Sequence, residues 1–238
     1  MKKEKPIAPA LEGEKKSEAK PKYDKPFRQP GGVYFHYGEV IGHKNVFVTK
    51  EYMDLLVNAF KLAELKQDIK NLAYVIMPNF FFWMFRLPEK MDNPADIYGE
   101  VKGQVATEVM KYLRKEIKEG AFDLLDIFKP NDRVGRSLPQ KILWSFEEQA
   151  KAFENNKRYK IWTPKTRTCP IDNDEKLRAK LAQIKKAPVS DRWRLVESAE
   201  KYPYLYLSEE VATLGEAGVD LASFCPVIQV NESVEVKT

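Results

Sequence analysis

Residues 72–86 read Leu-Ala-Tyr-Val-Ile-Met-Pro-Asn-Phe-Phe-Phe-Trp-Met-Phe-Arg and form the most apolar segment of the 238-residue chain. Pro78-Asn79 divides this segment into two runs that are rich in aromatic and β-branched residues, which favour strands. Proline inside a sheet is confined to strand edges and bulges. The segment therefore predicts either two strand pieces or one strand with a bulge.

The sequence on either side of this segment carries further strand and helix patterns. Val33 to Val40 has the composition of a strand, and Asn45–Val48 and Tyr159–Trp162 predict two shorter strands. Residues 49–70 predict a helix, because their apolar side chains recur at helical spacing behind a threonine N-cap. A second helix is expected at 93–118, which opens with Asn followed by Pro.

Two more helices complete the expected elements. Ser145-Phe-Glu-Glu148 fits a capping box and predicts a helix start. Asp172 or Asn173 is expected to cap a lysine-rich helix that ends before Pro188. Strands mixed with helices in this order indicate an α+β fold, in which helices pack on a small antiparallel sheet.

Composition excludes several classes of protein. Hydrophobic residues make up 43% of the chain, which excludes wholesale disorder. The longest apolar run, Phe80 to Phe85, is far shorter than the ~20 residues of a membrane-spanning helix, and no secretory signal is expected. Cys169 and Cys225 match no ligand or redox spacing. Cysteine usage indicates a reduced intracellular compartment. We expect no membrane association and no cofactor.

The net charge of +5 is distributed unevenly along the chain. Residues 1–30 carry +4, residues 31–156 carry −1, and residues 207–238 carry −5. Residues 157–194 hold twelve Lys/Arg against four Asp/Glu and carry +8. A localised excess of this kind indicates a surface that faces a polyanion, and a solvated charged surface is the alternative.

The basic segment also contains Tyr159, Trp162 and Trp193. Cations interleaved with aromatic rings suit contacts to a nucleic-acid backbone with occasional base stacking. A merely solvated helix face is the alternative. The nucleic-acid-binding candidates of this segment are Lys157, Arg158, Lys160, Lys165, Arg167, Lys180, Lys185, Lys186, Arg192 and Arg194.

Several short motifs occur in an order and spacing that resemble a known family. They are Ala73-Tyr-Val-Ile-Met-Pro-Asn-Phe-Phe-Phe82, Val101-Lys102-Gly103, Ile161-Trp162-Thr-Pro-Lys165, Asp172 to Leu181, Ile184-Lys-Lys-Ala-Pro188-Val189, Leu195-Val196 and Glu200-Lys-Tyr202-Pro203. Over about residues 33–207 the chain resembles the REP-associated tyrosine transposases and their insertion-sequence relatives, the HUH single-strand transposases. The resemblance implies a ferredoxin-like sheet with packed helices, and places Lys102 near the nucleic acid.

The resemblance also implies catalytic positions, and this chain departs from the family at each of them. Two histidines on the central strand hold a divalent metal in the family, where this sequence has Phe80 and Phe82. A phenylalanine has no lone pair for a metal. The family's nucleophilic tyrosine falls at Gln183, whose amide cannot form a covalent phosphate link. The sequence therefore predicts an inactive relative with no catalytic residues and no metal.

Some interpretations of these positions stay open. Phe80 and Phe82 suit either a base-stacking platform, at about 1–3 kcal/mol per base, or plain packing beneath a helix. His36 and His43 are the chain's only histidines and do not replace the missing pair. Another tyrosine, at 159, 202 or 204, is a candidate substitute for the nucleophile.

The chain divides into three expected parts. Residues 1–30 are a basic Lys/Pro-rich tail, residues 31–207 the transposase-like domain with an insertion at about 120–157, and residues 208–238 an acidic extension. The insertion is too aromatic for disorder, so it is expected to cover the degenerate site or to dock a protein partner. The tails are further candidates for protein contacts.

Three functions are weighed from the sequence. The first is a catalytically inactive protein that holds DNA or RNA without cleaving it. The second is a structural subunit of a large ribonucleoprotein such as a ribosome, which binds rRNA and neighbouring proteins. The third is an active metal-dependent single-strand DNA transposase or nuclease. The first two imply a cytoplasmic protein, associated with the nucleoid or with ribosomes.

Overall fold

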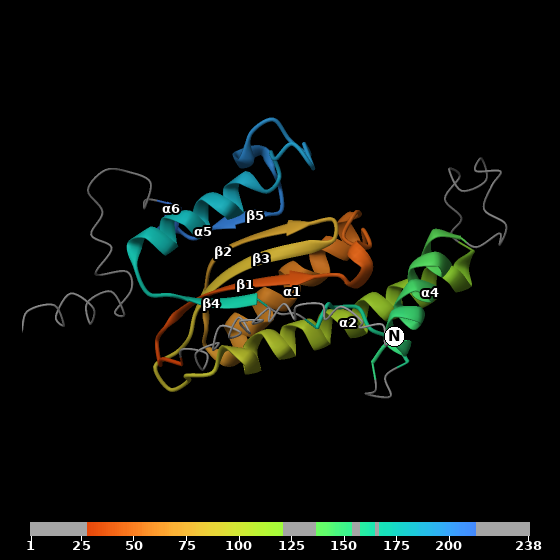
Figure 1. Cartoon of the computed structure of the whole chain (residues 1–238), viewed down its shortest axis with the longest axis horizontal. Coiled ribbons are helices and arrows are strands. Elements are labelled where there is room, and N and C mark those ends of the chain that lie inside the picture. The colour runs from red at the N-terminus through yellow and green to blue at the C-terminus, as the bar shows by residue number, and fades with distance from the viewer. Residues whose placement is uncertain (1–27, 121–136, 154–157, 165–166, 213–238) are drawn as a thin grey trace, which may run out of the picture.

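The computed structural model describes residues 28–120, 137–153, 158–164 and 167–212, and these form an α+β fold (Figure 1). Its core has the order strand, helix, strand, strand, helix, strand, which is the ferredoxin-like arrangement. The elements are β1 (Val33–Glu39), α1 (Lys50–Gln67), β2 (Lys70–Met77), β3 (Phe80–Arg86), α2 (Pro94–Glu119) and β4 (Arg167–Ile171).

Further elements are added to this core. They are the short helix η1 (Ile41–His43), α4 (Leu138–Lys151), α5 (Asp174–Lys186), the short helix η2 (Ala199–Lys201), β5 (Leu205–Leu207) and α6 (Glu209–Ala212). The five strands form one sheet in the order β4-β1-β3-β2-β5, and every neighbouring pair is antiparallel. The predicted class, a ferredoxin-like antiparallel sheet with packed helices, is confirmed.

The most apolar segment of the sequence is the central hairpin. β2 and β3 pair from Met77 opposite Phe80, with Pro78-Asn79 as the turn between them. The Nδ2 of Asn79 donates to the carbonyl of His43 at 3.0 Å, which ties the turn to the connection after β1. The segment therefore forms two strands, and the alternative of one strand with a bulge is wrong.

Helices cover both faces of the sheet, so the central strands are buried on both sides. Successive side chains of a strand point to opposite faces. Phe81, Trp83 and Phe85 of β3 pack with α1, α2 and α4 on one face. Phe82 and Met84 pack with α5 on the other face. Figure 1 shows α1 and α2 on one side of the sheet and α5 on the opposite side.

Two of the predicted helix caps, Asn93 and Asn173, are found with their side-chain bonds, whereas Thr49 precedes α1 without one. The Oδ1 of Asn93 accepts from the backbone N–H of Ala95 at 3.2 Å, and Pro94 occupies the first helical position of α2. The Oδ1 of Asn173 accepts from the N–H of Lys176 at 2.9 Å and caps α5. These side-chain acceptors satisfy N–H groups that a helix start leaves unpaired.

Two predicted strands are wrong. Asn45–Val48 forms no ladder, because the N–H groups of Val46 and Phe47 both donate to the single carbonyl of Pro78. Tyr159–Trp162 contributes only one bridge, between Trp162 and Val40. The strand in this region is β4, which begins eight residues after Tyr159 and pairs with β1.

The predicted helix start at Ser145–Glu148 is also wrong. Ser145 lies inside α4 with 7% of its surface exposed. The helix is capped at Ser137 instead, whose backbone N–H donates to the Oε1 of Gln140 at 2.9 Å. A serine followed three residues later by Glu or Gln fits the box pattern at both places, and burial of the second serine inside the helix excludes it as a cap.

Much of the predicted domain organisation falls outside the described residues. Residues 1–27 of the tail, 121–136 and 154–157 of the insertion and 213–238 of the C-terminal extension lie there. In the described part, the sheet begins at Val33 and ends at Leu207. Within that part, no helix combines the length and hydropathy needed to cross a bilayer.

Candidate nucleic-acid interface

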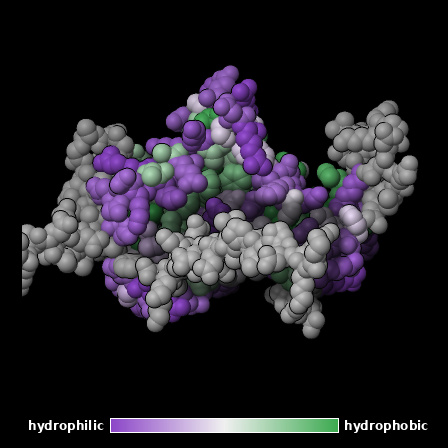
Figure 2. Space-filling view, in the orientation of Figure 1, coloured by the Kyte–Doolittle hydropathy of each residue, from purple (hydrophilic) through white to green (hydrophobic). Residues whose placement is uncertain are grey.

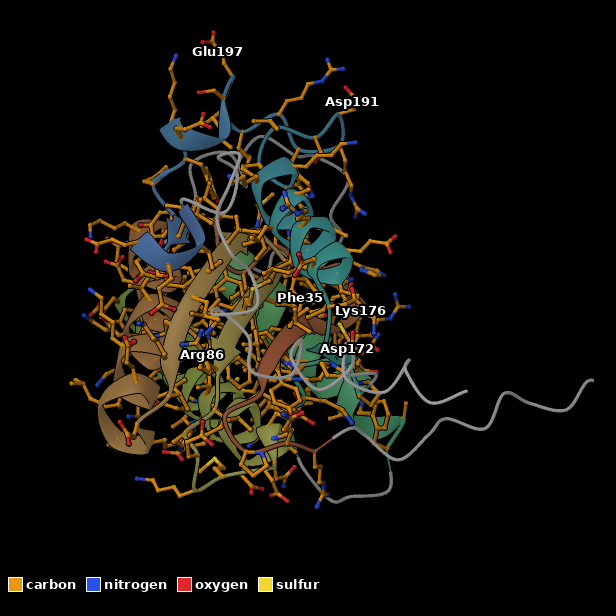
Figure 3. The ribbon with its side chains drawn as sticks, turned by 90° about the vertical axis from the view of Figure 1, so that its left-hand side faces the viewer. Phe35, Arg86, Asp172, Lys176, Asp191 and Glu197 are labelled. Atoms are coloured by element: carbon orange, nitrogen blue, oxygen red, sulfur yellow. The ribbon has the colours of Figure 1, made fainter. Side chains whose placement is uncertain are left out.

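A cleft of about 910 Å³ lies where α5 and the turn after it face the sheet. We call it the α5 cleft. The three positions that depart from the family's catalytic pattern, Phe80, Phe82 and Gln183, all line it. Figure 3 shows Phe35, another lining residue, on the sheet beneath α5, with Asp172 and Lys176 at the start of that helix and Asp191 beyond its end.

Aromatic rings form one wall of the cleft. The ring centroids of Phe80 and Phe82 lie 5.0 Å apart, and that of Tyr37 lies 5.5 Å from Phe82. Trp193 lies 6.1 Å from Phe80 at the opposite side. Phe82 is 8% exposed and Phe80 is half-buried. Phe82 therefore serves mainly as core, whereas Phe80 and Trp193 present ring surface to the cleft.

Four cations surround these rings. Lys180 and Lys186 lie on α5 with Gln183 between them, and a spacing of three residues places all three on one helix face. Arg167 comes from β4, and Arg192 from the turn after α5. In Figure 2, hydrophobic surface shows between hydrophilic side chains where α5 lies over the sheet.

The cleft cations contact rings and an amide. The Nζ of Lys180 lies 4.7 Å from the Phe35 ring centroid and donates to the Oε1 of Gln183 at 3.2 Å. The guanidinium of Arg192 lies 5.4 Å from the Trp193 ring. Within the described ranges, no carboxylate lies within ion-pair distance of Arg167, Lys180, Lys186 or Arg192. Their charge is available to an anion in the cleft.

The residues of this cleft do not fit the divalent metal that the resemblance implies. Phe80 and Phe82 occupy the ligand positions and have no lone pair to offer. The one carboxylate among the described lining residues is Glu39, whose Oε1 lies 2.6 Å from the Nδ1 of His43. No group of three His, Cys, Asp or Glu that could hold a metal occurs in the described part of the chain.

Of the tyrosines considered as a substitute nucleophile, Tyr202 and Tyr204 are held by hydrogen bonds, and Tyr159 is not among the residues that line the cleft. Tyr202 is buried, donates to the carbonyl of Ile76 at 2.7 Å, and has a pKa raised by burial to about 12. Tyr204 points to Asp54 of α1. Tyr37 is the tyrosine of the described cleft lining, and burial together with Glu39 raises its phenol pKa above the ordinary value. A raised pKa opposes formation of the phenolate that attacks a phosphate.

A second hollow, of about 870 Å³, lies on the other face of the fold, between α2 and residues 159–164. We call it the α2 groove. Lys102 and Lys160 line this groove and not the α5 cleft. The sequence predicted a single basic surface, and the structure divides it into two hollows. The hollows adjoin at Thr163 and Pro164, which line both of them.

The other predicted cations line neither hollow. Arg194 pairs with Asp191 at 3.0 Å, and Arg158 pairs with Glu147 at 3.3 Å. Lys185 is half-buried on α5 beside Lys186. Two further candidates, Lys157 and Lys165, lie outside the described residues.

Some site residues were not predicted from the sequence. Tyr37 and Phe35 line the cleft because they alternate on one face of β1, which the strand prediction for 33–40 already implied. Arg114 lines the groove at the end of a row that runs along α2 in steps of four residues from Lys102 through Ala106 and Met110. Helical periodicity applied to cations would have found it.

The comparisons with known proteins identify the fold. Neither a family model nor a curated protein matches the sequence. A solved structure described as a REP-associated tyrosine transposase bound to a REP hairpin matches with a TM-score of 0.50 and 18% identity, over 82% of this chain and 90% of that one. At this identity the likeness shows that the two chains share a fold, which is the fold that the motifs of 33–207 implied.

Proposed function

We propose that this protein binds single-stranded DNA or RNA in the α5 cleft and holds it without cleaving it. The observation that carries the proposal is the cleft itself, in which the rings of Phe80 and Trp193 lie beside four cations that have no carboxylate partner among the described residues. Grooves that combine stacking rings with a positive lining are typical of single-strand binding.

The spacing of the cleft residues supports a strand as the ligand. Lys186 and Arg192 lie at the rim, where they can meet phosphates, while the rings lie deeper between α5 and β3. A single strand exposes both its phosphates and its base faces, whereas a duplex hides its base faces inside the stack. The solved structure with the same fold is described as bound to a REP hairpin, which supports a nucleic acid as the ligand without favouring a single strand.

Absence of cleavage is proposed from the side chains that replace the implied chemistry. Phe80 and Phe82 offer no metal ligand, Gln183 offers no nucleophile, and the raised pKa of Tyr37 keeps its phenol protonated. The mechanism that follows is retention of the strand by ring stacking and by neutralised phosphates.

Binding is tested by fluorescence anisotropy with labelled oligothymidylate and oligouridylate over a series of salt concentrations. Trp193→Ala is expected to weaken binding by about 1–3 kcal/mol through the loss of one stacked base. Lys186→Ala with Arg192→Ala is expected to reduce the slope of log K against log salt by about 1.4, or ~0.7 for each phosphate that is no longer neutralised. An unchanged salt slope in this double variant would show that the α5 cleft does not bind the nucleic acid.

A matched control uses Lys61→Ala with Lys66→Ala. Both lysines are exposed on α1 and line neither hollow, so this variant removes the same formal charge from a distant surface. We expect its salt slope to equal that of the wild type. Equal losses in both double variants would instead indicate a general effect of net charge.

Cleavage is tested separately with hairpin DNA and Mg²⁺ or Mn²⁺, followed by denaturing electrophoresis. We expect intact DNA and no covalent adduct. An adduct in the wild type would overturn the non-cleaving proposal. Its loss in Tyr37→Phe would then identify Tyr37 as the attacking residue.

The class of nucleic acid is tested by fractionation of the cell from which the protein comes. We propose a cytoplasmic location, with the nucleoid or with ribosomes. Comigration with ribosomes at moderate salt would identify RNA as the ligand and favour the ribonucleoprotein function. Association with the nucleoid would identify DNA.

A further inference from the structure

The α2 groove is lined by cations and rings from two separate segments. Lys102 and Arg114 come from α2, whereas Tyr159, Lys160 and Trp162 come from the chain before β4. The Nζ of Lys102 lies 5.6 Å from the Trp162 ring, and the guanidinium of Arg114 lies 5.5 Å from the Tyr159 ring. The Nε1 of Trp162 donates to the carbonyl of Lys102 at 2.8 Å, which joins the two segments.

Three of these cations have no acidic partner. Among the residues that the structure describes, no carboxylate lies within ion-pair distance of Lys102, Arg114 or Lys160. Burial, and then the positive charge of Lys160, lower the pKa of Lys102 to about 8. Like charges gathered in a partly buried groove destabilise one another, and a bound anion relieves that cost.

The lining of the groove carries a second, independent feature. Gly99 and Gly103 lie one turn apart in α2, inside the helix and away from its ends. A Cβ added at either one would meet nothing within 4 Å among the described residues, and neither has a positive φ. Glycine is unfavourable inside a helix, and the fold does not require it at these two places.

Bare backbone beside unpaired cations suits a ligand that approaches the helix closely. Glycine is the residue that permits close approach of a ligand to the main chain. The groove's cations match phosphates, as those of the α5 cleft do, and the half-buried Tyr159 presents a ring to a base, whereas Trp162 is 8% exposed and serves mainly as core. The two hollows adjoin at Thr163 and Pro164, so one strand can pass from one to the other.

We propose that the α2 groove is a second phosphate-binding site, which takes the continuation of the strand held in the α5 cleft and seats its backbone against Gly99 and Gly103. This inference rests on the proposed function and adds a length requirement to it. A strand that fills only the cleft leaves the groove empty, whereas a longer one crosses Thr163 and Pro164 and occupies both.

The test compares labelled oligothymidylates of about 4 and about 16 nucleotides, the span of site sizes of single-strand-binding modules. In Arg114→Ala with Lys160→Ala, we expect the salt slope for the longer strand to fall by about 1.4, while the shorter strand binds as in the wild type. Lys61→Ala with Lys66→Ala is the control of equal charge, and we expect it to change neither strand.

Each outcome decides between the proposals. Binding of both strands by the wild type, with an unchanged long-strand slope in the groove variant, would overturn the second site and leave the cleft proposal standing. Equal losses for both strands would overturn it too. If the wild type binds neither strand, the proposed function fails and this inference fails with it.

A free nucleotide carries the same phosphate group as a strand, so a further binding experiment distinguishes these two ligands. Saturable binding of adenosine monophosphate that the groove variant abolishes, without any difference between the two strand lengths, would assign the groove to a free nucleotide. That result would overturn the strand path.

The glycines give a test that does not remove charge. Gly99→Ala with Gly103→Ala adds two methyl groups to the exposed lining of the groove and keeps every cation. We expect about tenfold weaker binding of the longer strand, unchanged binding of the shorter one, and no decrease in the unfolding temperature. Unchanged binding of the longer strand would overturn the close approach to α2.

Discussion

Asn71 joins three elements at the buried end of the central hairpin. Its Nδ2 donates to the carbonyl of Phe60 at 3.0 Å, and its Oδ1 accepts from the Nε1 of Trp83 at 2.8 Å. Its own backbone N–H donates to Glu64 at 3.1 Å. With 3% of its surface exposed, Asn71 has no water to replace these partners.

We predict that Asn71→Ala lowers the free energy of unfolding by about 1–3 kcal/mol, because it leaves the Trp83 Nε1–H buried and unpaired and removes the second hydrogen bond that the Phe60 carbonyl accepts. Urea denaturation measures the change. Asn45→Ala, at an exposed position, serves as the control and is expected to change stability by less than about 0.5 kcal/mol. A decrease of less than about 1 kcal/mol for Asn71→Ala would contradict the prediction.

His36 is buried in the middle of β1 and stays neutral there. Its ring stacks on Tyr98 at 4.4 Å, and its Nδ1 lies 2.8 Å from the Oγ1 of Thr168. Burial, and then the charge of Lys102, lower its pKa to about 3. The unfolded chain protonates this histidine near pH 6.5, so stability is complete above that pH and is lost as the pH falls towards 3.

We predict that the wild type loses about 2 kcal/mol more stability between pH 7 and pH 5 than His36→Phe does, since only the wild type has this histidine to protonate on unfolding. Denaturant titrations at the two pH values measure the difference. His43 is present in both proteins and cancels. Parallel pH profiles for the two proteins would show that His36 is not held neutral.

At the scale of elements, two glycines show how the same substitution has opposite effects. Gly99 is exposed on α2 with open space around it, whereas a Cβ at Gly38 of β1 would lie 2.3 Å from the ring of Phe81. The cross-strand pairing places Gly38 directly opposite Phe81, so the absence of a side chain makes room for that ring.

We predict that Gly99→Ala raises the free energy of unfolding by about 0.5–1 kcal/mol through helix propensity. Gly38→Ala is predicted to lower it by about 1–3 kcal/mol through overpacking. Thermal and urea unfolding of the two variants measure both signs. Destabilisation by Gly99→Ala would indicate that the described surroundings of that residue are not open.

The elements with strong local signals could be predicted from the sequence. The apolar runs on both sides of Pro78 and the caps at Asn93 and Asn173 depend on residues close together in the chain, and all of them are found. β4 was missed because Thr168, Cys169 and Pro170 are half-buried at a sheet edge and show no alternation. Its pairing with β1 joins residues that are more than a hundred positions apart in the chain.

The candidate site was predictable only in part, for a similar reason. Lys180, Lys186 and Gln183 share a helix face, which their spacing already shows. Sequence proximity could not show that Lys160 lies on the opposite face of the sheet from them, because residues 159–162 line the α2 groove whereas Arg167 of β4 lines the α5 cleft. The division of one basic segment into two hollows is a property of the tertiary structure.

For the whole molecule, the two hollows lie on opposite faces of one sheet and share no cation among the residues described. Effects of distant substitutions with no common partner usually add within about 0.5 kcal/mol. We predict this additivity for Lys186→Ala with Arg192→Ala and Arg114→Ala with Lys160→Ala on the longer strand. Anisotropy titrations of the two double variants and of the quadruple variant measure the three losses of binding free energy. A loss in the quadruple variant much smaller than the sum of the other two would indicate one shared electrostatic potential instead of two separate binding sites.

The two edge strands of the sheet affect whether copies of this protein can associate by strand pairing. The strand β4 forms one edge and contains the exposed Arg167 and Pro170, which has no N–H to donate. The strand β5 forms the other edge and is three residues long. Unprotected edge strands invite neighbouring copies to extend a sheet, and proline, charge and shortness each discourage this. Both open edges of the described sheet therefore carry features that discourage a second copy of the chain from pairing with them.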